Sequence, residues 1–150
     1  MDEVADMLGT GGPRLEAARL HPWVWEPAAR LWDGGHHREA VQAAATSLVL
    51  QTQAKAGRHD VTDKALYEQT FTLAPATPGK SRLRVREPDG TDTYRSTQEG
   101  VMNLGKGLSQ AVRNVASHTT DAIEEQDALE RLAALSMLAR FIDAAEIEEA

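Results

Sequence analysis

The sequence predicts an all-α fold, a bundle of four main helices with one small basic β-hairpin inserted before the third helix. Two observations predict it. Apolar residues recur at helical spacing in residues 36–55, 96–115 and 123–146, so each segment presents one buried face. Residues 81–86 instead alternate basic and apolar side chains with a period of two, which is typical of a half-buried strand.

Length and composition fit a single domain. The chain has 150 residues, of which 41% are apolar and 5% aromatic, enough for one helical core. We expect a flexible arm over residues 1–12 and one helical domain over residues 13–150. The absence of cysteine excludes disulfides, thiolate zinc sites and cysteine nucleophiles. No signal peptide or membrane-spanning stretch is recognisable, so we expect a cytoplasmic protein without membrane contact.

The net charge of −7 is concentrated at one end of the sequence. Residues 121–150 hold nine acidic residues and two arginines, which accounts for the whole excess, and residues 1–120 are neutral. A solvated acidic helix explains this pattern most simply. The charge therefore neither supports nor excludes an RNA ligand.

The first half of the chain contains the clearest helix signals. We expect a first helix over 13–20 and a second over 22–32, in which Pro27 makes a kink or an early stop possible. The helix over 36–55 ends at a C-cap glycine, Gly57. A shorter helix follows over 61–71. Four large apolar residues of the second helix are expected in the core: Trp23, Trp25, Leu31 and Trp32.

The hairpin is the one expected β element. Asp89-Gly90 offers a turn, after which Thr91 to Arg95 would return beside residues 81–86. Its arginines Arg82, Arg84 and Arg86 have two possible roles. They form either a solvated strand face or a basic surface that follows an RNA backbone, since phosphate contacts dominate nucleic-acid affinity.

A capping box is predicted to begin the third main helix, with Ser96 as the N-cap and Glu99 at the third helical position. Inside this helix Gly105 and Gly107 cost stability, which suggests close approach of another helix or a second subunit. The fourth main helix is expected over 123–146.

Arg113, Asn114 and His118 have the residue types for phosphodiester cleavage without a metal. A histidine can act as general acid or base, an arginine can stabilise the phosphate, and an asparagine can assist orientation. In an unbroken helix Arg113 and His118 lie about 140° apart. They would converge best if the helix ended near Val115 or Ala116.

Spacing alone does not identify a site. The chain has 12 arginines and five histidines, and Arg30 with His36 forms a second pair of comparable spacing. His36 and His37 at a helix start are more often solvated surface than metal ligands, and we expect neither a metal nor another cofactor.

The order of four sequence blocks favours the first pair. His21 to Glu146 resembles the Ymh family, a group of prokaryotic and phage proteins within the HEPN superfamily. The resemblance rests on His21-Pro22-Trp23-Val24, on Gly35-His36-His37, on Gly100 to Leu104 with Val112-Arg113-Asn114 and His118, and on Ala128 to Asp143.

The resemblance implies a four-helix domain, commonly dimeric, with an Arg-x4-6-His motif that cleaves RNA. That motif falls on Arg113 and His118, with Asn114 following the arginine, and Val115 stands where the family often has proline. We therefore expect a metal-independent endoribonuclease of the toxin or phage-defence type, formed by a homodimer, with an antitoxin as a possible partner. The alternative is a non-catalytic dimerisation or adaptor module with the same fold.

Overall fold

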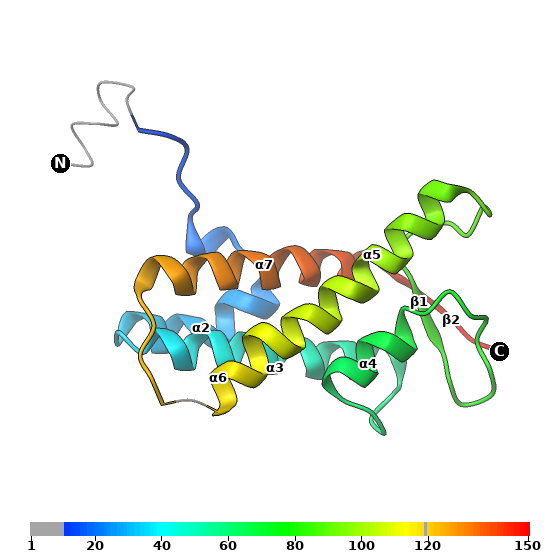
Figure 1. The fold of residues 1–150 in the computed structure, drawn as a ribbon, viewed down its shortest axis with the longest axis horizontal. Coiled ribbons are helices and arrows are strands. Elements are labelled where there is room, and N and C mark those ends of the chain that lie inside the picture. The colour runs from blue at the N-terminus through cyan, green and yellow to red at the C-terminus, as the bar shows by residue number, and fades with distance from the viewer. Residues whose placement is uncertain (1–10, 119) are drawn as a thin grey trace.

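A computed structural model describes residues 11–118 and 120–150, with the backbone only at Ser117 and His118. The chain is mainly helical, as predicted (Figure 1). Two long helices, α3 (His37–Ala56) and α7 (Glu125–Ala144), run along the long axis with α2 (Pro22–Asp33) packed against both. The helix α5 (Asp92–Leu108) crosses them and continues through η2 (Ser109–Asn114) into α6 (Val115–His118).

Aliphatic side chains from these helices form one core. Its fully buried members come from α2, α3, α4 (Asp63–Thr70) and α7, and include Val24, Val41, Leu48, Leu66, Leu132, Leu138 and Ile142. The four residues expected in the core lie at its edge instead: they pack against it but stay partly exposed, and they are Trp23, Trp25, Leu31 and Trp32. The helix positions therefore follow the periodicity of the sequence.

The N-terminal expectation is partly wrong. Among residues 13–20 only Ala17–Arg19 form a helical turn, the 3₁₀ helix η1. The segment is too short for a stable α-helix and its N-cap residue, Glu16, makes no side-chain capping bond. Helix α2 does not stop at Pro27 and extends to Asp33. Gly57 confirms the predicted C-cap, with a φ of 65° and its N–H on the carbonyl of Gln53.

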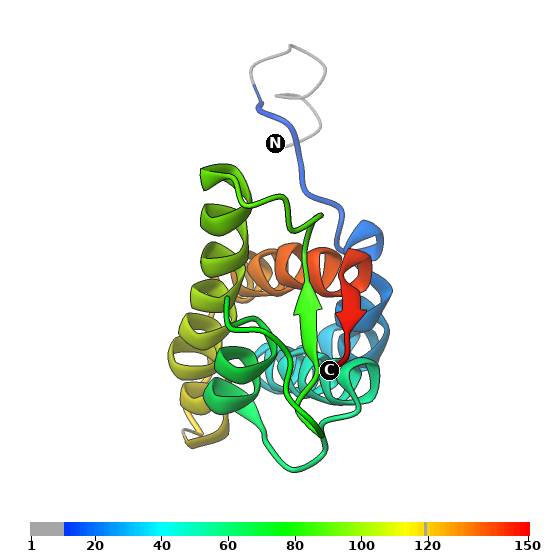
Figure 2. The same ribbon diagram turned by 90° about the vertical axis from the view of Figure 1, so that its right-hand side faces the viewer.

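The predicted hairpin is wrong in its second strand. β1 (Arg82–Arg84) pairs antiparallel with β2 (Glu146–Glu148), so the partner comes from the end of the chain (Figure 2). Residues 91–95 cannot return as a strand because Thr91 caps α5 by accepting a hydrogen bond from Tyr94 N at 3.1 Å. The N-cap thus lies five residues before the predicted cap, Ser96, and α7 ends before Glu146.

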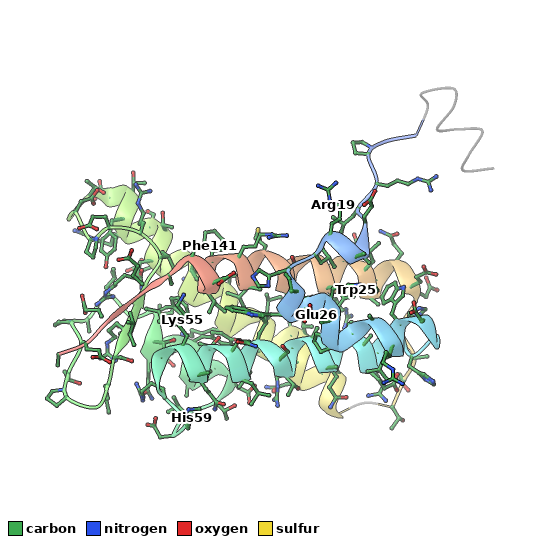
Figure 3. The ribbon with its side chains drawn as sticks, turned by 180° about the vertical axis from the view of Figure 1, so that it is seen from behind. Arg19, Trp25, Glu26, Lys55, His59 and Phe141 are labelled. Carbon is green, nitrogen blue, oxygen red and sulfur yellow. The ribbon has the colours of Figure 1, made fainter. Side chains whose placement is uncertain are left out.

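Two side chains, those of Lys55 and His21, fix the C-terminal end of α7. Lys55, which lies between α3 and α7 in Figure 3, donates from Nζ to the carbonyls of Ile142 at 2.9 Å and Asp143 at 2.6 Å. His21, at the N-cap of α2, reaches the same end of α7: its Nε2 donates to Asp143 Oδ2 at 2.8 Å. These bonds hold the chain in position where it leaves α7 for β2.

Candidate active site

The predicted site lies where α5 changes its helical geometry. Ser109–Asn114 form a π-helix, η2, between α5 and the short helix α6. Wider π turns are rare inside helices and frequent at functional sites. Ser109 and Val112 are buried, whereas Arg113 and Asn114 are partly exposed. The π-helix therefore presents these two predicted site residues at the surface.

Arg113 forms an ion pair with Asp63, the first residue of α4. The guanidinium Nη1 lies 2.9 Å from Asp63 Oδ1 and 3.0 Å from Oδ2. The Arg113 side chain is 24% exposed and that of Asp63 22%, so solvent reaches the pair. The hydrogen bond goes to Oδ2 alone, and the buried Oδ1 has no hydrogen-bond partner among the described residues. The pair therefore lacks the two parallel bonds of a bidentate arginine–carboxylate contact.

Asp63 holds an unusual backbone conformation. Its φ is 54°, the one positive value of a non-glycine residue in the described part of the chain. Such conformations cost of order 1–3 kcal/mol and concentrate at functional sites, although aspartate tolerates the left-handed region better than most residues. The ion pair with Arg113 is a contact that this conformation makes possible. Sequence reasoning missed Asp63 because the pair joins residues 50 positions apart.

Two buried polar atoms accompany the pair. Arg113 Nε and Ser109 Oγ have no hydrogen-bond partner within the part of the chain that the structure describes. Both residues line a cavity of about 10 Å³, together with Tyr67 of α4. Burial raises the pKa of the Tyr67 hydroxyl well above its usual range, and the Asp63 carboxylate adds to this effect. Tyr67 therefore stays protonated near neutral pH and is no candidate base.

Gly105 explains how α4 comes so close to α5. A Cβ added at Gly105 would lie 2.6 Å from Tyr67 Cγ, so the close approach predicted for this glycine is confirmed as an interior contact. Gly107 makes no such contact, since nothing lies within 4 Å of an added Cβ. The contact at Gly105 seats α4 where Asp63 can reach Arg113.

The end of this helix differs from the expectation. The helix does not end near Val115 or Ala116, because α6 extends to His118. Arg38 of α3 donates from Nη1 to the carbonyl of Ala116 at 2.8 Å and so supports this last turn. The side chain of His118 lies outside the described residues. The π-helix around Arg113 departs from the 100° step of an α-helix, so the 140° separation calculated for an unbroken helix does not apply here.

Arg82 and Arg84 do not form a solvated strand face. Both are buried, and their guanidinium groups face the protein. Arg82 Nη1 donates to the carbonyl of Gln69 at 3.0 Å. Arg84 donates to the carbonyls of Thr72 and Ala74 and pairs with Glu148 Oε2 at 2.9 Å. The pairing with β2 and the loop after α4 buries them. Of the three predicted RNA-contacting arginines, only Arg86 is exposed.

Of the remaining histidines, His36 and His59 are exposed, whereas His21 and His37 make structural contacts. His21 is buried, and its Nδ1 accepts from Trp23 N at 3.1 Å, which places the proton on Nε2 facing Asp143. The His37 ring lies tilted against the Trp32 ring, with 4.6 Å between the ring centroids. Among the described residues no three histidine or acidic side chains cluster as metal ligands. In the same residues no helix has the length and apolar character to cross a membrane.

Comparison with known proteins identifies a family. The family described as "Protein of unknown function (Hypoth_ymh)" matches residues 18–142, a range that runs from η1 almost to the end of α7 and includes the whole candidate site. No curated protein and no solved structure matches the chain. Because the family match covers most of the sequence, the chain belongs to the Ymh family.

Proposed function

We propose that this Ymh-family protein is a HEPN-like, metal-independent endoribonuclease whose site contains Arg113, Asn114 and His118. The 2′-hydroxyl of RNA attacks the adjacent phosphorus, the bond to the 5′-oxygen breaks, and a 2′,3′-cyclic phosphate and a 5′-hydroxyl remain. His118 takes the proton from the 2′-oxygen or gives one to the leaving 5′-oxygen. Arg113 stabilises the charge on the phosphate, and Asn114 orients it.

The observation that carries this proposal is the placement of Arg113. It stands on a π-helix, reaches solvent with a quarter of its side chain, and is held by Asp63, a residue with a positive φ. A guanidinium fixed at the surface can meet a phosphate without first losing side-chain entropy. Burial of Arg82 and Arg84 leaves Arg86 as the proposed RNA contact on the strand segment.

A second copy of the chain completes the proposed site. Arg113 stands on the π-helix and His118 lies at the end of α6, five positions further along the same helical run, and we infer that one chain does not bring both to one phosphate. Val115 lies between them and is 48% exposed, so its side chain is available for contact with a second copy. We propose that two such segments meet in a homodimer and form one composite cleft. An effector of this kind, a toxin or phage-defence protein, acts in the cytoplasm and pairs with an antitoxin.

The test is cleavage of mixed RNAs by the purified protein in excess EDTA. We expect products with 2′,3′-cyclic phosphate ends and a rate at least 100-fold lower for His118→Ala, since general acid–base catalysis contributes about 10²–10⁴-fold. His59→Ala is the matched control, because His59 is an exposed histidine in the loop before α4. Equal cleavage by the wild-type protein and His118→Ala, or no cleavage by either, would contradict the proposal.

A non-catalytic dimerisation or adaptor module is the second candidate. The Arg113–Asp63 ion pair favours it, because the carboxylate already neutralises the arginine. This candidate predicts that the protein sediments as a dimer and does not cleave RNA. The mass of the dimer should stay the same in the double variant in which Arg113 and His118 are both replaced.

A further inference from the structure

We infer that Asp63 is a positioning residue that restrains Arg113 and competes with the RNA phosphate for its guanidinium. The inference rests on the proposed function, since it takes Arg113 to be the residue that meets the phosphate. It adds a member to the site that neither the sequence motif nor the family match assigns.

The geometry of the pair is what suggests this role. Asp63 Oδ2 accepts a hydrogen bond from Arg113 Nη1 at 3.0 Å, and Oδ1 lies 2.9 Å from the same nitrogen without a hydrogen bond. The described contacts of Asp63 do not involve the other edge of the guanidinium, and Nε on that edge is buried without a hydrogen-bond partner. An arginine has five N–H donors in a fixed fork. Because Nε is buried, a phosphate can reach Arg113 only at the exposed part of its side chain, where it competes with the carboxylate.

The surroundings show that the pair is not held by burial alone. Each side chain is more than a fifth exposed, and exposed ion pairs contribute only about 0–1 kcal/mol. A phosphate approaching Arg113 meets the negative charge of Asp63 at the same place. The carboxylate thus opposes ground-state binding of RNA while it fixes the guanidinium for the reaction.

Asp63→Asn removes the charge with little change to the backbone, because asparagine also tolerates the left-handed region at φ 54°. Asp127→Asn is the matched control: Asp127 pairs with Arg131 on α7 at 3.3 Å, so the same charge is lost at an exposed helix pair. Binding of a fluorescent single-stranded RNA oligonucleotide is measured by anisotropy in the His118→Ala background, with EDTA, so that no RNA is consumed.

We expect Asp63→Asn to tighten RNA binding about two- to fivefold, the equivalent of an exposed charge interaction. The tightening disappears when Arg113→Ala is added, and Asp127→Asn changes binding less than about 1.5-fold, since distant exposed charges are screened. With His118 present, single-turnover cleavage by Asp63→Asn falls at least about tenfold, because the guanidinium is no longer held in place.

Unchanged or weaker RNA binding by Asp63→Asn overturns the inference, and so does tightening that persists without Arg113 or that Asp127→Asn reproduces. In a protein that cleaves RNA, an unchanged single-turnover rate also overturns it. A wild-type protein that cleaves no RNA refutes the proposed function instead. In that case the RNA affinities of Asp63→Asn, Arg113→Ala and the double variant still decide whether the carboxylate restrains a phosphate-binding arginine.

Discussion

Arg84 and Arg113 each pair with one carboxylate, but they do so near opposite ends of α4 and in different surroundings. Arg84 is 6% exposed and also binds two backbone carbonyls, which leaves its guanidinium with protein partners on several sides. Arg113 is 24% exposed, has one carboxylate partner and keeps Nε unpaired. Residue type therefore does not tell which arginine is fixed inside the fold and which is open to solvent, whereas burial and the number of partners do.

The largest effect on stability is expected at the strand end. Arg84→Met keeps the aliphatic packing but removes the donors to Thr72, Ala74 and Glu148, so we expect a loss of about 2–4 kcal/mol in the free energy of unfolding. Urea denaturation measures it. The exposed Arg86→Met is the control and should change stability by less than about 0.5 kcal/mol. Similar losses from both variants would remove the distinction between buried and exposed arginines.

The helix contact that seats Asp63 is the next target. Gly105→Ala places a methyl group 2.6 Å from Tyr67 Cγ, and overpacking of this kind costs about 1–3 kcal/mol. Gly107→Ala, in the same helix with open space at its Cβ, should instead stabilise the protein by about 0.5–1 kcal/mol. The two variants therefore have opposite signs in a thermal melt. A stabilising Gly105→Ala would show that α4 is free to shift away from α5.

Acid should weaken the strand end selectively. The hydrogen bond from Arg84 holds the pKa of Glu148 below its ordinary value of 4.5. A lowered native pKa means that this stability is fully present above the unfolded pKa and is lost as pH falls through the native pKa. Melting temperatures at pH 7 and pH 3.5 measure the loss. The melting temperature of Glu148→Gln should fall less between pH 7 and pH 3.5 than that of the wild-type protein. The difference should be about 2–4 °C for each kcal/mol of stability that the Glu148 carboxylate contributes at pH 7. If the melting temperatures of Glu148→Gln and the wild-type protein fell equally, the Glu148 carboxylate would not be paired with Arg84.

The smallest stability effect is expected at the candidate site. Removing an ion pair that solvent reaches costs about 0–1 kcal/mol, so Arg113→Ala should unfold at nearly the same urea concentration as the wild-type protein. A loss of 3 kcal/mol or more would place Arg113 in the same structural class as Arg84.

Local sequence signals predicted the local parts of the fold. The periodic segments became α3, α5 and α7, and Gly57 ended α3 as expected. The predicted start of α5 was wrong because two capping signals competed there. Thr91 and Ser96 both begin plausible capping sequences, and the N-cap in the structure is Thr91. The partner of β1 was missed because β2 lies 64 positions further along the chain, at the Arg84–Glu148 pair.

The candidate site shows the same limit. Arg113, Asn114 and His118 were recognisable because they lie in one short segment, and a motif is a local pattern. Their setting was not, because Asp63 and Arg38 reach the segment from α4 and α3, 50 and 78 positions away. The π-helix was equally hidden, since Ser109 to Asn114 carry no residue that marks a wider turn.

The central claim is that Arg113 serves chemistry and Arg84 serves the fold. The most direct measurement is the rate of RNA cleavage in excess EDTA by the wild-type protein and Arg113→Ala at matched concentrations of folded protein. The account predicts cleavage by the wild-type protein and a rate about 10²–10³-fold lower for Arg113→Ala, with the urea midpoint nearly unchanged. Undiminished cleavage by folded Arg113→Ala, or an inactive wild-type protein, would contradict it.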